Sequence, residues 1–164
     1  MVAQTKLAPG GVGSTYGGER PHLTEWPPAR LVDTDVWPRV HGRRSIELGT
    51  PGEMRARLNW LVHEGRKRAT AGLLAEYAQE GEDLEHVGER LAVLDDDGRS
   101  VAIVEITQVD VLPFAEVPWE FAAAEGEGDE DLEEWRAGHR REWAAEGTTV
   151  DDDTQVVCLR FVRV

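Results

Sequence analysis

The chain has 164 residues, 40% of them hydrophobic and 30% charged, which is typical of one globular domain with a single core. Its formal net charge of −14 argues against a protein that coats duplex nucleic acid, because such proteins usually present a basic face to the phosphates. No run approaches the roughly 18 apolar residues of a membrane span, and no secretory signal is readable. The single cysteine, Cys158, excludes an internal disulfide, so a cytoplasmic protein is expected.

Residues 1–44 are predicted to form a flexible extension, because glycine and proline are frequent there and no hydrophobic periodicity is sustained. Residues 45–164 then form the domain. Residues 44–48 predict a short strand that leads into the first helix.

The clearest helix follows Gly49. Thr50 is the expected N-cap, Pro51 the first helical residue and Glu53 the acid of a capping box. Gly65 is expected to end the helix. One face carries the apolar residues Met54, Leu58, Leu61 and Val62, which predicts packing on the core.

The polar segment 76–86 is predicted to be irregular. Residues 90–94 and 101–109, joined by a turn of the Asp-Gly kind, predict a β-hairpin. The second strand is apolar on both faces, as in a buried central strand. Its one charge, Glu105, either faces a polar pocket or lies at an edge. The turn is not a calcium loop, because Val93 and Val104 would occupy the first and last ligand positions.

Two further helices and a strand complete the domain. A short helix is expected at about 117–124, and Asp129 is expected to cap a second one through Ala145. One face of the second helix carries Leu132, Trp135, His139 and Trp143. His139 on such a face is either a core histidine or a site residue, with a basic rim beside it. Residues 154–164 predict a final strand that buries Cys158 as an inert thiol.

The turn 65–70 gathers most of the local positive charge. Residues 51–70 hold five Arg or Lys against two acids, whereas residues 71–164 hold seven Arg against twenty-five acids. A cationic patch on an acidic body suits a small anionic or nucleotide-like ligand, or a short single strand. Lys67 and Thr70 are spaced to point into one pocket. The alternative is that the cations only cap the end of the helix.

Five strings occur in a fixed order along the chain: Glu47-Leu-Gly-Thr-Pro-Gly52, Gly65-Arg-Lys-Arg-Ala-Thr70, Pro113-Phe-Ala-Glu-Val117, Glu125-Gly-Glu-Gly-Asp129 and Trp135-Arg-x-x-His139. Together they resemble the ASCH domain family, over about residues 45–164. The resemblance implies an α+β fold, a PUA-like β-barrel with flanking helices, and a cleft for RNA or a modified nucleoside.

Some members of that family are amidohydrolases that deacylate N4-acylated cytidine. Carried over residue by residue, the resemblance implies that Thr70 attacks the amide carbonyl with Lys67 as its base, and that Glu125 protonates the leaving amine. Lys67 would need a lowered pKa, to which Arg66 and Arg68 would contribute. Glu127 and Glu105 are alternative acids. No cofactor is implied.

Substrate-binding candidates are Arg66, Arg68, Glu105, His139 and Arg140. Two other functions use the same cleft. In an RNA-binding module, the cations of the turn would contact phosphates while Trp60 or Trp119 stacks on a base. In a ribonuclease, the cleft would cleave single-stranded RNA.

Overall fold

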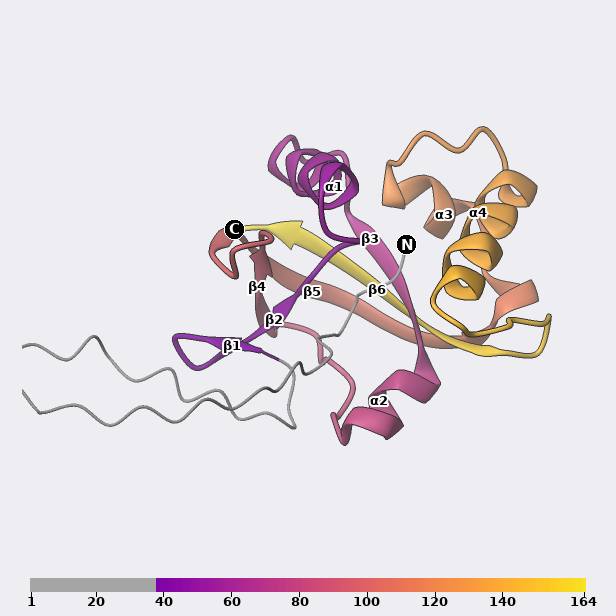
Figure 1. The fold of residues 1–164 in the computed structure, drawn as a ribbon, viewed down its shortest axis with the longest axis horizontal. Helices are drawn as coiled ribbons and strands as arrows, with labels where there is room; N and C mark the ends of the chain where they lie inside the picture. Colours follow the sequence, from indigo (N-terminus) through magenta and orange to yellow (C-terminus); the bar gives the residue numbers. More distant parts are fainter. Residues whose placement is uncertain (1–37) are drawn as a thin grey trace, which may run out of the picture.

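The computed structural model describes residues 38–164, and a twisted sheet of six strands is the centre of that part of the chain (Figure 1). The strands are β1 (Arg39–Val40), β2 (Arg43–Ile46), β3 (Ala69–Leu73), β4 (Arg90–Leu94), β5 (Ser100–Pro113) and β6 (Gln155–Arg163). Their order is β1-β2-β4-β5-β6-β3, and only the β2–β4 pair is parallel.

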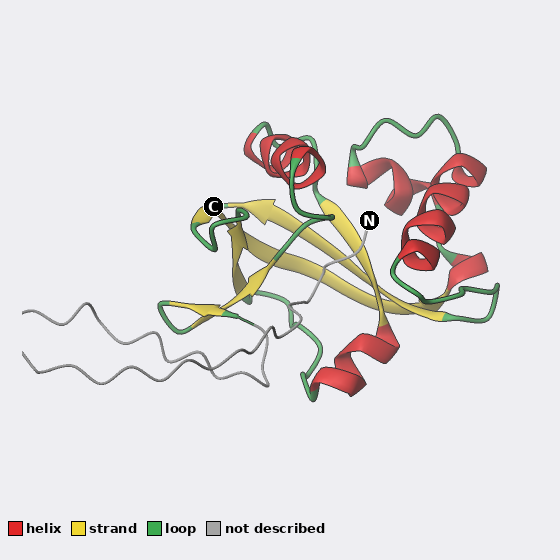
Figure 2. Cartoon of the chain, viewed as in Figure 1, coloured by secondary structure: helices red, strands yellow, loops and turns green. Residues whose placement is uncertain are grey.

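In the described part of the chain, four α-helices flank the sheet (Figure 2). They are α1 (Glu53–His63), α2 (Leu74–Glu80), α3 (Trp119–Glu125) and α4 (Leu132–Ala145), with a 3-10 turn at Phe114–Glu116. Helix α1 runs into β3, α2 follows β3 at its other end, and α3 packs beside α4 (Figure 1). The α+β class is therefore confirmed.

The sheet does not close into the expected barrel. Within residues 38–164 the ladder ends at β1 on one side and at β3 on the other. Strand β1 has two residues and pairs only with β2, so it offers little length for closing on β3. Strands β1 and β2 also include Arg39, Val40, Arg43 and Arg44, which the sequence had assigned to the extension. Residues 1–37 of that extension lie outside the described part.

Strand β6 separates two hydrophobic cores. Its Val157, Leu159 and Phe161 belong to a first core with Leu58, Leu61 and Val62 of α1. Its Val156 and Cys158 belong to a second core with Phe121 of α3 and Trp135 and Trp143 of α4. Alternate residues of a strand face opposite sides of a sheet, so one strand lines both cores. As predicted, Cys158 is a buried free thiol.

Most predicted elements are present, with shifted ends. Helix α1 begins at Glu53 after Gly52, and Thr50 does not cap it: the Thr50 hydroxyl instead lies 3.3 Å from the Met54 sulfur. Gly65 follows the end of α1 as expected, with a φ of 69°. Asp131, not Asp129, caps α4 and accepts a hydrogen bond from the Glu134 N–H at 2.9 Å.

Two predictions about the middle of the chain were right only in part. The segment 76–86 begins within α2, because Tyr77 packs into the first core and gives this polar stretch a buried side. Strand β5 is central in the sheet and extends beyond 109, yet Val101 and Val111 are exposed. The buried residues of β5 are Val104 and Ile106, and both belong to the first core, so the strand is not buried on both faces along its length.

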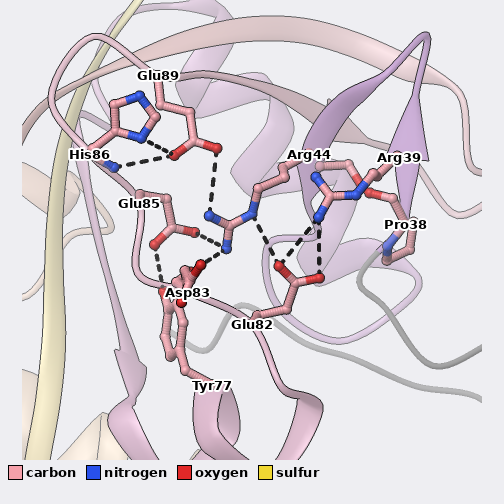
Figure 3. A network of polar contacts seen from close by, with 10 residues as sticks. Pro38, Arg39, Arg44, Tyr77, Glu82, Asp83, Glu85, His86 and Glu89 are labelled. Carbon is pink, nitrogen blue, oxygen red and sulfur yellow. Dashed lines mark hydrogen bonds and ion pairs between the residues drawn. The ribbon is translucent and has the colours of Figure 1, made fainter.

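A polar network centred on Arg44 fixes the segment after α2 (Figure 3). The guanidinium of Arg44 on β2 lies 3.5 Å from carboxylate oxygens of Glu82, Glu85 and Glu89, and donates to the Asp83 carbonyl at 2.8 Å. The Tyr77 hydroxyl donates to Glu85 at 2.9 Å. This network ties α2 and its following loop to the sheet.

Candidate functional site

The turn that carries Lys67 is held between two helix ends. The Lys67 N–H donates to the Leu61 carbonyl of α1 at 3.0 Å, and the Arg68 N–H donates to the Ala124 carbonyl of α3 at 2.8 Å. Phe161 of β6 donates to the Arg68 carbonyl at 2.9 Å. The backbone of the turn is therefore fixed before any side chain acts.

Gly126 allows the end of α3 to approach this turn. Its φ is 68°, in the left-handed region that favours glycine. A Cβ at this position would lie 2.3 Å from the Arg66 carbonyl oxygen, well inside van der Waals contact. The glycine in the Glu-Gly-Glu string thus brings its two flanking acids to Lys67.

Lys67 is the centre of a buried charged cluster. Its amine lies 2.5 Å from Glu127 Oε1 and 3.5 Å from Glu125 Oε2, while Lys67 is 1% and Glu125 0% exposed. We call Lys67, Glu125, Glu127 and His139 the Lys67 cluster. The structure therefore brings both acids of the 125–129 string to the amine, and Glu127 is the nearer.

His139 joins this cluster from α4. Its Nδ1 lies 3.0 Å from the Trp135 carbonyl oxygen, and its Nε2 lies 3.7 Å from Glu125 Oε2. The ring also packs against Trp135 and Trp143, at centroid distances of 4.1 and 5.0 Å. His139 is therefore a core residue, because its ring packs between two tryptophans, and it also lies beside the candidate site residue Glu125.

The electrostatics of Lys67 differ from the expectation. Burial alone would lower the pKa of its amine, but the carboxylates of Glu127 and Glu125 more than offset burial and raise the pKa above 10.5. Arg66 and Arg68 are exposed and do not reverse this. In the free protein, Lys67 is therefore an ammonium. Burial lowers the pKa of His139 well below its ordinary value, so its ring is neutral.

Further acids surround the cluster. Burial, with the charges of Glu127 and Glu125 nearby, raises the pKa of Asp129 and of Glu142. Sequence reasoning missed both as neighbours of the site. The signal for Glu142 was its spacing of three residues from His139, which places the two side chains on adjacent parts of one helix face.

Thr70 is buried on β3, three residues after Lys67. Its strand neighbours Ala69 and Ala71 belong to the second core, so strand alternation directs the Thr70 side chain toward the first core. Its register partner Leu159 lies in that core too. Thr70 and the helices α3 and α4 are thus on opposite faces of β3.

The other candidate residues lie apart from the cluster. Glu105 forms an ion pair with Arg90 at 2.9 Å across β4 and β5, on the sheet surface. Arg140 pairs with Asp152 at 2.7 Å and lies over the Phe114 ring. Arg66 lies over the ring of Trp60, which is 53% exposed, with 5.9 Å from guanidinium to centroid.

Three further findings concern the residues that the structure describes. No group of three or more His, Cys, Asp or Glu side chains within residues 38–164 is placed to hold a metal ion. A surface hollow lined by Glu76, Glu80 and Glu146 lies at the α2 end of β3, away from Lys67. None of the helices in this part of the chain is long and apolar enough to cross a membrane.

Comparison with known proteins identifies the family. The family model of the ASCH domain matches residues 44–164. The crystal structure of an ASCH domain from Lactobacillus crispatus JV V101 is 34% identical, with a TM-score of 0.57, covering 66% of this chain and 71% of that one. A protein of Enterococcus faecalis V583, described under the family model DUF984, is 33% identical with a TM-score of 0.64, covering 72% and 74%.

No curated protein matches the chain. The five strings, the fold and the family match agree over the same residues. This chain belongs to the ASCH domain family.

Proposed function

We propose that this ASCH domain is a cytoplasmic amidohydrolase that removes the acyl group from the exocyclic amine of N4-acylcytidine-type nucleosides. The observation that carries the proposal is the fully buried Lys67 between Glu125 and Glu127. Burying an ion pair is often no more stabilising than apolar packing, so such a cluster points to chemistry rather than to stability. The family resemblance supplies the reaction.

The proton inventory of the cluster fits a stepwise amide hydrolysis. Lys67 holds its proton in the free protein, and Glu127 at 2.5 Å is the acceptor to which it passes that proton. The neutral amine then takes the proton of the Thr70 hydroxyl as that oxygen attacks the carbonyl carbon. Glu125 gives a proton to the leaving amine nitrogen. Water subsequently hydrolyses the Thr70 ester and restores the three groups.

The position of Thr70 places a condition on this mechanism. Its side chain lies on the β3 face that lines the first core, while the acids reach Lys67 from α3. The substrate carbonyl must therefore lie at the start of β3, between α1 and α3. The exposed side chains of Arg66 and Arg68 precede the start of β3, and we propose that they contact the ribose or phosphate.

The test is hydrolysis of N4-acetylcytidine by the purified protein, followed by the absorbance change as the amide is cleaved. Wild type is expected to turn over, whereas Lys67→Met and Thr70→Val are expected to lose at least about 100-fold in kcat, as removal of a general base or nucleophile does. Arg140→Gln and Glu105→Gln are controls expected to keep activity, because both lie outside the cluster. A folded wild type with no turnover would reject this substrate class.

A second candidate function is single-stranded RNA binding, favoured by Arg66 above the exposed Trp60 ring. An exposed indole beside a guanidinium can stack on a base. Lys67 does not contribute phosphate contacts in that function, since its amine is buried. Trp60→Ala would then weaken RNA binding while leaving nucleoside turnover unchanged. Cleavage of the bound strand would identify the ribonuclease instead.

A further inference from the structure

The Lys67 amine is closed off from solvent in this structure. The side chains of Lys67 and Glu125 have no exposed surface, and the side chain of Glu127 is 10% exposed. Thr70 is also buried. A substrate amide therefore cannot reach the amine unless one of the surrounding parts of the chain moves. The contacts of each part indicate which one is free to do so.

Three of the surrounding parts are tied to the body of the fold. The turn 65–68 donates hydrogen bonds to carbonyls at the ends of α1 and α3. Helix α3 buries Phe121, and α4 buries Trp135 and Trp143, in the second core. Moving any of these parts would expose apolar surface to water or leave backbone groups without partners.

The segment 127–129, in the connection between α3 and α4, is tied less firmly. Among the described residues, its backbone makes no hydrogen bond to other backbone groups. Glu127 lies between Gly126 and Gly128, whose φ values are 68° and 111°, and glycine changes its backbone conformation more easily than other residues. Figure 1 shows this connection as the loop that leaves α3 on the side facing α1. Local opening costs little where backbone hydrogen bonds and buried apolar contacts are few.

Two contacts hold this segment over the Lys67 amine, and both involve Glu127. Nη2 of Arg57 on α1 donates to the Glu127 carbonyl oxygen, and the Glu127 carboxylate accepts from the Lys67 amine at 2.5 Å. The Arg57 guanidinium also lies beside Gly128, since a Cβ there would be 3.9 Å from Nη2. Arg57 is exposed, so it restrains the segment from the solvent side while Lys67 restrains it from the interior.

We propose that the segment 127–129 is a gate over the Lys67 amine, that Arg57 is the latch that keeps it closed, and that substrate enters through it. Entry of substrate rests on the proposed function, whereas the gate itself does not. When the gate opens, Glu127 moves away from Lys67 and the amine becomes accessible. Arg57 is a positioning residue, because it acts through Glu127.

Acylation of Lys67 by a small N-hydroxysuccinimide ester tests the gate without any substrate. The chain has two lysines, Lys6 and Lys67, so peptide mass spectrometry reads Lys67 by itself. In wild type, Lys67 is expected to react far more slowly than free Nα-acetyllysine, because reaction requires the gate to open. Arg57→Gln is expected to react about three- to tenfold faster than wild type, the effect of losing one hydrogen bond.

The matched control for Arg57→Gln is Arg136→Gln. Arg136 on α4 also donates to a backbone carbonyl, that of Ala115 at 2.6 Å, but it does not contact the gate. Its substitution removes the same kind of hydrogen bond from another part of the fold. The rate of Lys67 labelling in Arg136→Gln is therefore expected to equal that of wild type.

A second pair of variants tests the gate while leaving Arg57 in place. Gly128→Ala strains the closed segment, because a φ of 111° is unfavourable for alanine, although the added Cβ makes only ordinary contacts. Labelling of Lys67 is expected to rise by at least about fivefold. Gly147→Ala, with a φ of 92° and open space around it, carries similar strain after α4 and is expected to leave the labelling rate unchanged.

Urea separates opening of the gate from unfolding of the whole domain. Labelling through the gate is expected to depend little on urea below the unfolding transition, because a local opening exposes little surface. A wild-type rate that rises steeply from the lowest urea concentrations would overturn the gate, and so would equal rates in wild type, Arg57→Gln and Gly128→Ala. These readouts do not involve turnover, so a protein that fails to hydrolyse N4-acetylcytidine can still have the gate.

For the role in the reaction, the KM for N4-acetylcytidine is the decisive measurement. A protein whose binding-competent state is only partly populated binds its substrate more weakly by that fraction. Arg57→Gln is therefore expected to lower KM by about the factor by which its Lys67 labelling rises, with no increase in kcat. An unchanged KM in an Arg57→Gln protein with faster labelling would show that substrate enters elsewhere, and would overturn the role of the gate in substrate entry.

Discussion

Lys67 illustrates how a single residue joins folding to chemistry. Its amine has no exposure, and a lysine without a partner at such a depth would lose its charge. Two carboxylates keep the charge in place, and both arrive through the short segment after α3. The protonation state of Lys67 therefore depends on backbone geometry about sixty residues away along the chain.

That dependence makes Gly126 a decisive residue. Gly126→Ala places a methyl group 2.3 Å from the Arg66 carbonyl oxygen, so either α3 or the turn must move. A loss of at least about 2–3 kcal/mol is expected, from overpacking and a left-handed backbone together, with loss of the Lys67–Glu127 contact. Urea denaturation and N4-acetylcytidine turnover are the two measurements.

The control for Gly126→Ala is Gly81→Ala. Gly81 ends α2 with a φ of 66°, nearly the value at Gly126, but has open space around it. Its substitution carries the backbone strain alone, about 1 kcal/mol. Equal losses in the two variants would show that the close approach at Arg66 is not a constraint.

At the scale of elements, α2 is the helix that the polar composition of its sequence did not predict. Glu76 in its first turn lies beside Glu146 and Glu80, and burial first, then Glu146, raises its pKa from 4.5 to about 7. The folded protein thus binds this proton more tightly than the unfolded chain. Stability from this group is therefore present at low pH and falls as pH rises from 4.5 to about 7.

Glu76→Gln removes that pH dependence. The variant is expected to melt above wild type at about pH 8, and to lose this advantage as pH falls to the ordinary range of a glutamate. Thermal melting of both proteins across this range is the measurement. Glu80→Gln, one helical turn later in the same hollow, is the control, and its advantage is expected to be smaller because it removes only a neighbouring charge.

The Arg44 network anchors the loop between α2 and β4. Arg44→Met leaves Glu82, Glu85 and Glu89 close together without this buried guanidinium, and should cost about 3–5 kcal/mol at neutral pH. The carboxyls escape part of this cost by binding protons, so the deficit should shrink as pH falls toward 4.5. Urea denaturation at two pH values measures both effects.

Arg39→Met is the matched control for Arg44→Met. Arg39 contacts the same Glu82 at 3.4 Å, but its side chain is 44% exposed and solvent screens the pair. A loss of about 0–1 kcal/mol is expected. A comparable loss in both variants would mean that burial of Arg44 adds nothing to its contribution.

Sequence patterns predicted those helices and strands whose hydrophobic periodicity is complete within one segment of the chain. The hairpin at 90–109, the apolar face of α4 and the final strand follow from periodicity within one segment. Helix α2 was missed because only Tyr77 gives it a buried side, through contact with a distant core. The open sheet was missed because strand length at β1, not pattern, decides closure.

For the candidate site, too, some features could be predicted from local sequence and others depend on tertiary contacts. The Lys67 string was visible in the sequence, and the acidic string supplied both of its partners. The sequence could not show that Glu127 lies closer to the Lys67 amine than Glu125 does, because these distances depend on the backbone turn at Gly126. Glu105 and Arg140 were included for their charge, and the fold pairs each with a surface residue instead. The raised pKa of Lys67 likewise follows only from tertiary contacts.

At the scale of the whole molecule, the site lies where the two cores meet. Helix α1 packs in the first core and α3 and α4 in the second, and β3 and β6 separate them. The turn 65–68 bonds to the ends of both α1 and α3. A ligand bound there would contact both halves of the fold, so its binding is expected to stabilise them together.

The global charge limits what that ligand can be. With a net charge of −14, the molecule repels long polyanions, and within residues 38–164 the exposed Arg and Lys side chains near the turn are those of Arg57, Arg66 and Arg68. Each phosphate contact with single-stranded nucleic acid contributes about −0.7 to the slope of log Kobs against log salt, so three contacts give a slope no steeper than about −2. Titration of a fluorescent oligoribonucleotide at several salt concentrations measures that slope.

The variant Arg66→Ala/Arg68→Ala is expected to flatten the slope by about 1.4, since two contacts are removed. Lys67→Met is expected to leave it unchanged, because the Lys67 amine is buried and paired with Glu125 and Glu127. A Lys67→Met slope reduced by about 0.7 would instead mean that the cluster opens and that Lys67 meets a phosphate. That result would favour the RNA-binding function over hydrolysis of a free nucleoside, because it would give the buried amine a phosphate partner.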